Sequence, residues 1–550
     1  MFSKFIKDLK KEFKGYNGAT LSKDLMAGLT VAAVALPLAL AFGVSSGADA
    51  ASGLVTAIIA GILIGGLGGA SYQISGPTGA MSAILLSLSA TYGINGVLTA
   101  GLISGVILLI AALIKAGKLV AYIPSAVITG FTSGIAIIIA LGQIDNFFGT
   151  TSAGANAIEK ILSYSRFGFS PNMLAVLFGV IVILIMVFYP KKLNAVFPSS
   201  LASIIIVLII NMIVNPDGTL VKEVGAIPKS FFTDNALIKQ GIDFSSVSGL
   251  IIPAFSIAIL GMIESLLCGA SAGKMKGEKM DSQRELVAQG IGNIVIPLMG
   301  GVPATAAIAR TSVAIKSGGK TRLVSVFHSI TLILSMFLLG GVMSRIPLSA
   351  LAGVLIVTAW RMNDWADIKK IFDTKFKTAI AQFIITMVAT VIFDLTIAIC
   401  AGVVLSMLLF IIKSSELSVN VSDVDTKKTA KQGISGSYKY TKLVYIAGPL
   451  FFGTQGKITQ TVKAFDDTTL DVIFSMRAVP SIDNGAVDEF EEVYDYLTHK
   501  NISVLFCGIN PSVMKMLERS GFVDKIGRDK FLWDAVAAIK EIEKKVFITE

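Results

Sequence analysis

Ser-Gly-Pro-Thr-Gly-Ala at residues 75–80 and Gly-Gly-Val-Pro-Ala-Thr-Ala-Ala at residues 300–307 each interrupt a long apolar region of the chain. In both stretches a proline lies near the point where a helix is expected to begin again, a place where its missing amide costs little. The small residues that follow leave the first amides of each helix open to a ligand. Because helix N-termini carry a partial positive charge, this pair of breaks predicts a site for an anion.

The composition around these breaks is that of a membrane protein. The chain has 550 residues, of which 53% are hydrophobic and 15% are charged, and its mean hydropathy is +0.75. Apolar runs long enough to cross a bilayer recur from about residue 25 to about residue 413. The formal net charge of +10 comes mostly from lysine and arginine in short turns between these runs. That placement favours cytoplasmic loops over a nucleic-acid partner.

The apolar segments number about fourteen, with about seven on each side of a polar connection at 215–246. Loops after every second segment are rich in lysine and arginine, as expected if the N-terminus is cytoplasmic. Halves with an odd number of spans lie in opposite orientations, which is the geometry of inverted repeats, and broken helices at matching places mark their shared substrate site. The predicted segments are 25–44, 53–70, 77–91, 96–114, 119–141, 173–189 and 198–214, then 247–271, 285–299, 304–315, 322–343, 347–360, 377–394 and 396–412.

The two ends of the chain differ from this membrane region, which we place at 24–413. Residues 1–23 are basic and amphipathic and lack the apolar core of a signal peptide, so we expect a cytoplasmic segment on the membrane surface. A polar linker is expected at 414–436. Residues 437–550 alternate β-rich and helical runs, which is typical of a small α/β domain. Its expected strands are 444–447, 469–474 and 502–506, and its expected helices are 459–464, 487–498 and 512–520.

A threonine is expected in the first helical turn after each break. Its hydroxyl and the neighbouring amides have the chemistry to replace the water shell of a small oxyanion. The alternative is that threonine only caps the helix and that the small residues only permit close packing. The matched occurrence in both halves favours a binding site. The candidate anion ligands are Thr78, Gly79, Ala80, Thr305, Ala306 and Ala307.

Two charged residues belong to the apolar segments near the breaks. Glu264 lies inside a span, where an ionisable group is costly and usually faces a cavity, a partner or a transported ion. It is a candidate proton carrier for coupled uptake, and the alternative is a structural hydrogen bond between helices. Arg310 follows Thr305 by five residues. It adds positive potential at the site, pairs with Glu264, or reaches the cytoplasmic surface.

Other chemistries lack their motifs. Cys268, Cys400 and Cys507 have no metal-ligand spacing and the chain has only 2 histidines, so no metal or other cofactor is expected. The sequence has no phosphate-binding loop of the Walker type, which argues against ATP-driven transport, and no arrangement of a hydrolase. We therefore expect a transporter driven by an ion or substrate gradient, and not an enzyme.

The motifs, taken together, resemble those of the SulP (sulfate permease) family. The resemblance implies an α-helical membrane fold of about fourteen spans in two inverted repeats, divided into a core and a gate. It also implies an elevator-like movement of one anion, commonly in a dimer, and a C-terminal STAS domain. The matching stretches are Asp24–Thr30, Ala35–Pro37, Ser75–Gly79, Gly261–Leu267, Pro303–Thr311 and Ser317–Thr321, with Val479–Ala486 in the STAS region.

Three departures from the family pattern sharpen these expectations. Leu38 takes the place of a glutamine that many members have, and with Phe42 it is expected to line the site from the first helix. Sodium-coupled bicarbonate members look to have aspartate and threonine where this chain has Glu264 and Cys268, which favours protons over sodium. Asn484 stands where the related anti-sigma-factor antagonists have serine, which argues against phosphorylation there.

We therefore expect a secondary active transporter of a small anion, sulfate by family default, coupled to protons. Bicarbonate and a C4-dicarboxylate remain open as substrates. An anion channel, or a membrane receptor whose soluble domain signals, is the alternative class. The expected location is the inner (plasma) membrane with both termini cytoplasmic. The expected partners are the anion, protons, the lipid bilayer and a second copy of the chain, and no nucleic acid.

Overall fold

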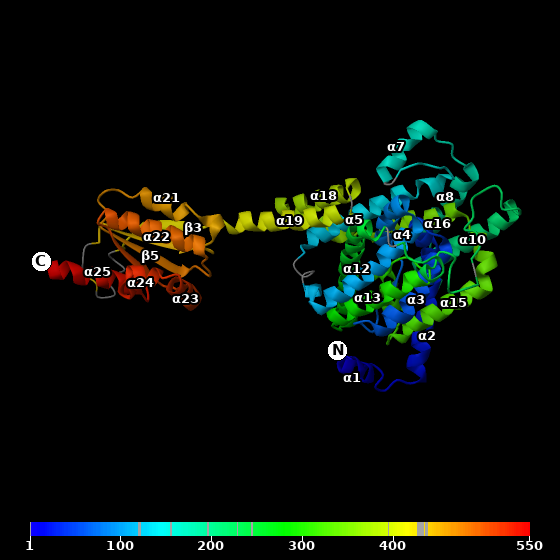
Figure 1. The fold of residues 1–550 in the computed structure, drawn as a ribbon, viewed down its shortest axis with the longest axis horizontal. Helices are drawn as coiled ribbons and strands as arrows, with labels where there is room; N and C mark the ends of the chain where they lie inside the picture. The colour runs from blue at the N-terminus through cyan, green and yellow to red at the C-terminus, as the bar shows by residue number, and fades with distance from the viewer. Residues whose placement is uncertain are drawn as a thin grey trace. The chain divides into compact units, whose positions relative to one another are not determined.

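The computed structural model describes residues 2–118, 123–154, 157–194, 197–227, 229–243, 246–393, 395–425, 434 and 438–549. The chain divides into two compact units, Met1–Val403 and Val404–Glu550, here called unit 1 and unit 2. Unit 1 is built of helices and one small two-stranded sheet, and unit 2 contains a five-stranded sheet (Figure 1). Much of the predicted linker, including Lys427, Lys428 and Lys431, lies outside the described residues.

The helices of unit 1 follow the predicted apolar segments closely. The first half contains α1 (Phe2–Glu12), α2 (Gly18–Ser45), α3 (Ala50–Leu67), β1 (Ser75–Gly76), α4 (Gly79–Leu113), α5 (Ser125–Gly142), α6 (Ile144–Phe148), α7 (Ala157–Phe167), α8 (Met173–Phe188), α9 (Lys191–Asn194) and α10 (Ser199–Val214). The second half contains α11 (Leu237–Gln240), α12 (Val247–Lys276), α13 (Ser282–Leu298), β2 (Thr305–Ala306), α14 (Ile308–Lys316), α15 (Leu323–Met343), α16 (Leu348–Met362), α17 (Trp365–Asp373), α18 (Lys377–Ile392) and α19 (Leu395–Ser414), the last of which continues into unit 2.

Polar side chains at the helix starts explain several of these boundaries. Asn17, Asp49 and Asp281 each accept a hydrogen bond from the amide three residues later and so begin α2, α3 and α13. Within α4, Gly93 has a φ of 68°, a conformation that glycine adopts without strain. This break divides α4 into the two segments that the sequence predicts at 77–91 and 96–114.

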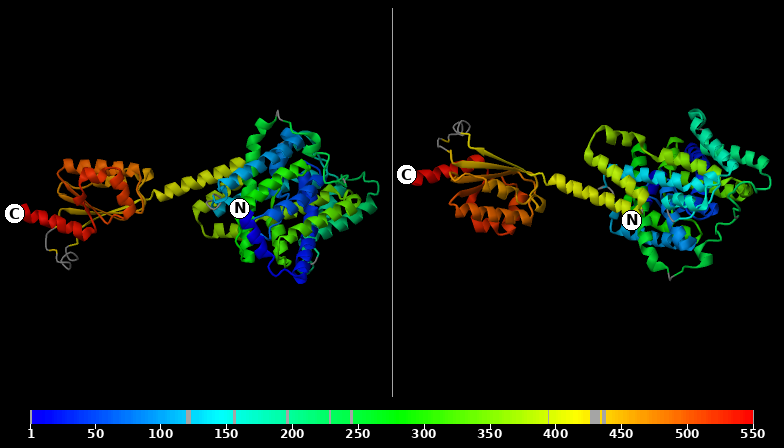
Figure 2. Two further views of the ribbon diagram at one scale, coloured as in Figure 1. Left: turned by 60° about the horizontal axis from the view of Figure 1, so that its bottom comes forward. Right: turned by 90° about the horizontal axis from the view of Figure 1, so that it is seen from above.

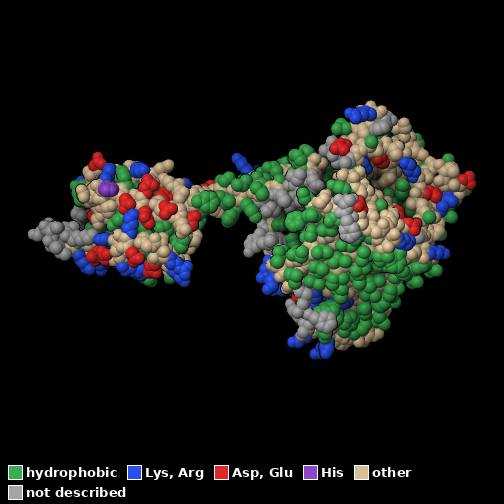
Figure 3. All heavy atoms as spheres, in the orientation of Figure 1, with side chains coloured by type: hydrophobic (Ala, Val, Ile, Leu, Met, Phe, Trp, Pro, Cys, Tyr) green, Lys and Arg blue, Asp and Glu red, His purple; other side chains and the backbone are tan. Residues whose placement is uncertain are grey.

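Six helical stretches of the described residues are long and apolar enough to cross a membrane. They are α2, α3, α4, α5 together with α6, α12 and α15, and shorter apolar helices include α8, α10 and α18. A broad apolar surface covers one side of unit 1 (Figure 3), as expected of a surface that faces lipid. The total of about fourteen crossings stays a prediction.

Two groups of helices pack among themselves within unit 1. In the first group α4 packs against α12 and α13, while α2, α3 and α15 pack against one another. In the second group α5 packs against α16 and α18, and α8 packs against α10 and α16. The first group brings segments of both halves side by side, drawn in blue and green in Figure 2. This group carries both of the predicted breaks.

Short helices in the connections were not predicted. The loop expected at 143–172 contains α6 and α7, and the loop after α16 contains α17. Each has 11 residues or fewer, so a search for membrane-length apolar runs passes over them.

Unit 2 contains a mixed sheet in the order β3-β4-β5-β6-β7. Its first two strands pair antiparallel and the others pair parallel. Helices α21 to α24 contribute to the apolar core on one face, and α25 contributes to the core on the other face. The elements are β3 (Ser418–Asp423), β4 (Thr441–Ala447), α21 (Lys457–Lys463), β5 (Asp471–Ala478), α22 (Asn484–His499), β6 (Ser503–Cys507), α23 (Pro511–Arg519), α24 (Phe522–Ile526), β7 (Phe531–Leu532) and α25 (Ala535–Thr549).

The predicted boundary of the C-terminal domain at 437 needs a correction. Strand β3 lies within the stretch assigned to the linker, and it pairs with β4 along its whole length. Its sequence, Ser-Val-Asn-Val-Ser-Asp, is mostly polar and largely exposed, as is common for an edge strand. The three predicted strands and three predicted helices of this domain agree with β4, β5, β6, α21, α22 and α23.

Candidate functional site

The two breaks of the sequence meet in the structure. Strand β1 pairs antiparallel with strand β2, with Ser75 opposite Ala306 and Gly76 opposite Thr305. An antiparallel meeting of equivalent segments is what two oppositely oriented halves require. The helices that follow the strands, α4 and α14, therefore begin close to the paired strands β1 and β2, a region here called the junction.

Thr78 is the N-cap residue of α4. Its hydroxyl lies 3.4 Å from the amide of Met81, so the capping alternative is part of its role. Within the described part of the chain, the amides of Gly79 and Ala80 donate to no protein acceptor. These two amides remain available for a ligand at the start of α4.

The second break differs from the expected helix at 304–315. Helix α14 begins only at Ile308, and Thr305 lies in strand β2 rather than in a first helical turn. The amide of Ala306 donates to Ser265 Oγ at 3.3 Å, and the amide of Ala307 donates to the carbonyl of Ile74 at 2.9 Å. Both amides are thus engaged by the protein, that of Ala306 by a side chain of α12 and that of Ala307 by the backbone just before β1.

Glu264 connects the two threonines. Its Oε2 atom accepts the hydroxyl of Thr78 at 2.9 Å and the hydroxyl of Thr305 at 2.5 Å, and the two hydroxyl oxygens are 3.1 Å apart. Thr305 is fully buried, whereas Glu264 on α12 is partly exposed. A single carboxylate oxygen therefore receives a hydroxyl from each half of unit 1.

Arg310 on α14 points at the other break. Its Nη2 donates to the carbonyl of Pro77 at 2.7 Å, and its Nη1 has no hydrogen-bond partner among the described residues. The side chain is 2% exposed, so the alternative of reaching the cytoplasmic surface is wrong. Arg310 forms no ion pair with Glu264 within the described structure; it supplies a buried positive charge beside β1 instead.

Helix α2 brings an apolar side chain to the start of α4. Leu38 and Phe42 are both buried on α2. A Cβ atom at Gly79 would lie 3.2 Å from Phe42 Cε1 and would collide with Ile139 Cδ1. Phe42 therefore lies against the start of α4, and the lining role of Leu38 and Phe42 stays a prediction.

Sequence reasoning missed the polar residues of α13 that hold the second break. The amide side chain of Asn293 donates to the carbonyl of Ala304 at 3.0 Å and accepts its N–H at 2.8 Å. Gln289 donates to Ser75 Oγ at 3.2 Å. These residues and Glu285 are spaced four apart, and the residues between and after them in α13 are apolar or glycine. That spacing is a stripe of polar side chains on one face, the signal that identifies them.

Comparisons with known proteins cover both units. Residues 21–389 match the sulfate permease family, and residues 431–538 match the STAS domain. The chain is 33% identical over 534 residues to "Putative sulfate transporter YvdB" of Bacillus subtilis (strain 168), which covers 94% of this chain and 97% of that protein. It is 28% identical over 537 residues to the bicarbonate transporter BicA of a Picosynechococcus species, with 94% of each covered.

Two solved structures share the architecture. The murine Solute Carrier 26 family member A9 anion transporter in its inward-facing state aligns with a TM-score of 0.84 at 18% identity, over 96% of this chain and 92% of that chain. The transmembrane domain of a cyanobacterium bicarbonate transporter, BicA, aligns with a TM-score of 0.62 at 27% identity, over 71% of this chain and 98% of that chain. The family match covers most of the chain, and the relatives match it nearly from end to end. The chain therefore belongs to the sulfate permease family, as an integral membrane anion transporter, not an enzyme, with a C-terminal STAS domain.

Proposed function

We propose that the chain carries out secondary active transport of a small oxyanion, sulfate by default, coupled to protons through Glu264. The observation that carries this proposal is the meeting of the two threonine hydroxyls on one carboxylate oxygen. The anion is proposed to bind beside Thr78, Thr305 and the open amides of Gly79 and Ala80. The unpaired Nη1 of Arg310 lies next to Gly76 in the same junction and adds positive potential.

The coupling follows from competition for the same donors. An ionised Glu264 holds both hydroxyls itself and repels a second negative charge at short range. A protonated Glu264 carries no net charge and accepts hydrogen bonds more weakly than the carboxylate, so the two hydroxyls are freer to turn toward an arriving anion. Binding of the anion is therefore proposed to take up a proton, which links uptake of the substrate to the proton gradient.

Bicarbonate is the second candidate substrate, since the chain is similar over 94% of its length to a bicarbonate transporter. A C4-dicarboxylate is a third, because amides and hydroxyls bind any small oxyanion. Sodium is the alternative coupling ion. Three oxygens of Glu264, Thr78 and Thr305 lie within 3.1 Å of one another, a grouping that a sodium site could use. Cys268, one turn after Glu264 on α12, is a poor sodium ligand.

The movement is proposed to be of the elevator type. The helices that carry the junction, among them α2, α3, α4, α12, α13 and α15, pack as one group, and α5, α8, α10, α16 and α18 pack as another. Sliding of the first group along the second would carry the site across the membrane without unpacking either group. A homodimer in the inner (plasma) membrane, with both termini cytoplasmic, completes the proposal.

The test is uptake of labelled sulfate by the full-length protein in sealed vesicles. With an acidic exterior, the wild-type protein should accumulate sulfate above its external concentration, and Glu264→Gln should lose the response to the proton gradient. Glu278→Gln is the matched control, because Glu278 lies outside the junction and is about half exposed. Proton-driven accumulation by Glu264→Gln would refute the role of Glu264.

The same vesicles separate the alternatives. A sodium gradient that drives uptake without a proton gradient would favour sodium coupling. Competition by bicarbonate or by a C4-dicarboxylate at lower concentration than sulfate would reassign the substrate. Flux that only equilibrates the anion would indicate a channel. Absence of flux for every anion tested would favour the signalling alternative.

A further inference from the structure

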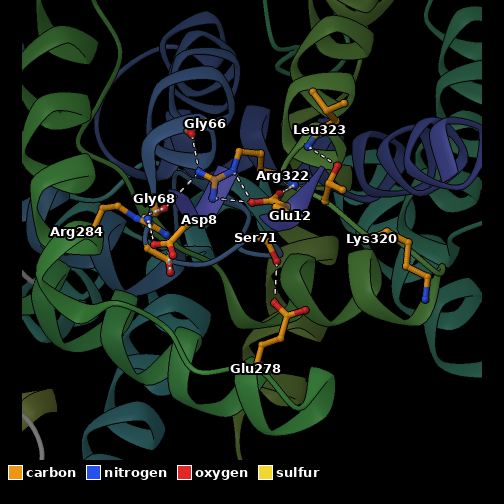
Figure 4. A network of polar contacts seen from close by, with 12 residues as sticks. Asp8, Glu12, Gly66, Gly68, Ser71, Glu278, Arg284, Lys320, Arg322 and Leu323 are labelled. Carbon is orange, nitrogen blue, oxygen red and sulfur yellow. Dashed lines mark hydrogen bonds and ion pairs between the residues drawn. The ribbon is translucent and has the colours of Figure 1, made fainter. Parts of the chain in front are cut away.

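Helix α1 contacts the rest of unit 1 through ion pairs and cation–π interactions (Figure 4). Arg284 Nη1 donates to Asp8 Oδ2 at 2.7 Å, and Arg322 Nη2 donates to Glu12 Oε2 at 2.8 Å. The two guanidinium carbons lie 5.3 and 5.4 Å from the centre of the Phe5 ring. Phe5, Asp8 and Glu12 follow one another at helical spacing, so they form a single side of α1, here called the clasp face.

The same two arginines hold the end of α3 and the loop that leads from it to β1. Arg284 donates to the carbonyls of Gly68 at 3.1 Å and Gly69 at 3.3 Å, and Arg322 donates to the carbonyl of Gly66 at 2.7 Å. Figure 4 shows the arginines beside Gly66 and Gly68 together with the two ion pairs. The clasp face is thus attached to the connection that positions the first break.

Further contacts lead from this loop to the anion junction. Glu285 Oε2 accepts the amide of Gly69 at 2.9 Å. Gln289 donates to Glu285 Oε1 at 3.0 Å and to Ser75 Oγ at 3.2 Å. Ser75 belongs to β1, so an unbroken series of hydrogen bonds joins the helix group held by α1 to the strand at the site.

The opposite side of α1 has no partner within the described structure. Lys7, Lys10 and Lys11 on α1 and Lys14 in the turn that follows it, here called the lysine face, are all exposed and recur at spacings of three and four. Between the two faces lies an apolar strip that includes Ile6, which is 39% exposed. Leu9 and Phe13 share that strip and are partly exposed. Lysine and arginine side chains gather below the apolar surface at this end of unit 1 (Figure 3).

We propose that α1 binds anionic lipid headgroups through its lysine face and connects them, through its clasp face, to the helices of the anion site. The lysine face matches an anionic bilayer surface in charge, and the apolar strip beside it suits the interface of a bilayer. A short turn connects α1 to α2, an apolar helix of membrane-spanning length. Binding of headgroups would hold the clasp face in place and with it the loop before β1. The consequence for transport rests on the proposed function, whereas binding of lipid does not.

The test is hydrogen exchange of the full-length protein in nanodiscs of phosphatidylcholine, with or without about 30% phosphatidylglycerol. Exchange of the amides of residues 5–12 should slow on the order of tenfold with the anionic lipid, and added salt should reverse the effect. The quadruple change of Lys7, Lys10, Lys11 and Lys14 to Gln should remove the response. Equal exchange in both lipids, or an undiminished response of that variant, would overturn the proposal.

Two further variants separate the faces. Asp8→Asn with Glu12→Gln should raise exchange at residues 66–71 while α1 keeps its response to lipid; unchanged exchange there would remove the clasp contact from the proposal. The matched control replaces four exposed lysines of unit 2, Lys463, Lys515, Lys540 and Lys544, by Gln, and should behave as wild type.

In transport, anionic lipid should change the sulfate rate of the wild type more than that of the lysine-face variant. Lipid-dependent protection without any transport would contradict the proposed function but still support lipid binding by α1.

Discussion

At the scale of residues, the proposed site has two threonine hydroxyls for which Glu264 and the anion compete. Thr78 and Thr305 come from different halves of the chain, and Glu264 holds both of them. A threonine that merely capped a helix would not need a carboxylate partner from a third element. The arrangement gives each hydroxyl two roles, one with the carboxylate and one with the proposed anion.

Removing one hydroxyl tests this arrangement. Thr305→Val keeps the shape of the buried side chain and removes its donor, so it should weaken anion binding by about 1–2 kcal/mol, roughly five- to thirtyfold. Thr331→Val is the control, because Thr331 donates only to the carbonyl of Phe327 in its own helix. Binding of labelled sulfate and the midpoint of thermal unfolding should be measured together. Unchanged sulfate affinity in a folded Thr305→Val protein would speak for packing as its sole role.

At the scale of elements, the site depends on two strands of two residues each. Gly76 in β1 brings the backbone so close to Arg310 that a Cβ atom there would lie 2.6 Å from Nη1. The end of an arginine side chain can shift, whereas the paired backbone of β1 and β2 cannot. A side chain at position 76 should therefore displace the guanidinium group and leave the fold intact.

The variant Gly76→Ala tests whether displacing the guanidinium group of Arg310 weakens anion binding. We expect normal folding and an affinity for sulfate that is lower by roughly tenfold, since the buried charge moves away from the junction. Gly341→Ala is the control, because a Cβ atom there meets no other atom within 4 Å. A Gly76→Ala protein that binds sulfate as tightly as the control would show that the position of Arg310 does not matter.

The elements also show where sequence reasoning works and where it stops. The breaks and most of the helix bounds follow from apolar periodicity and from the glycine and proline residues at the breaks. Leu38 and Phe42, both buried on α2, were expected at the site from the family resemblance instead, and their role there stays a prediction. The pairing of β1 with β2 was not predictable, because strands of two residues have no periodicity. For the same reason the engagement of the Ala306 and Ala307 amides was missed. Only the three-dimensional meeting of the breaks reveals which amides stay open.

At the scale of the whole molecule, the chain consists of two units that differ in composition and core. The apolar core of unit 1 follows from hydropathy alone. The start of unit 2 does not, since β3 is a polar edge strand that resembles a linker. Leu417, just before β3, is 7% exposed and belongs to the core of unit 2, which indicates that β3 is part of the folded domain.

Two fragments of unit 2 test that boundary. Residues 415–550 should be more stable than residues 437–550 by roughly 2–4 kcal/mol, because the shorter fragment loses β3 and the burial of Leu417. Urea unfolding followed by circular dichroism measures the difference. Equal midpoints would restore the linker interpretation of 414–436.

The thiol of Cys507 reports on the folding of the same domain. Burial raises the pKa of Cys507 to about 11, so the thiol stays protonated and enclosed at pH 8 while the domain is folded. Alkylation should be slow in the native protein and fast in denaturant, as seen by mass spectrometry of the Cys507 peptide. Above about pH 9 the unfolded form loses this proton first, so stability should fall as the pH rises. Rapid alkylation of the native protein at pH 8 would contradict the buried position.

The most direct measurement is the number of protons that the purified full-length protein takes up when sulfate binds, followed with a pH indicator in weak buffer. Competition between Glu264 and the anion for the same hydroxyls predicts proton uptake on binding by the wild type and none by Glu264→Gln. Glu278→Gln should behave as the wild type. Sulfate binding without proton uptake by the wild type, or with undiminished uptake by Glu264→Gln, would contradict the coupling of the anion to Glu264.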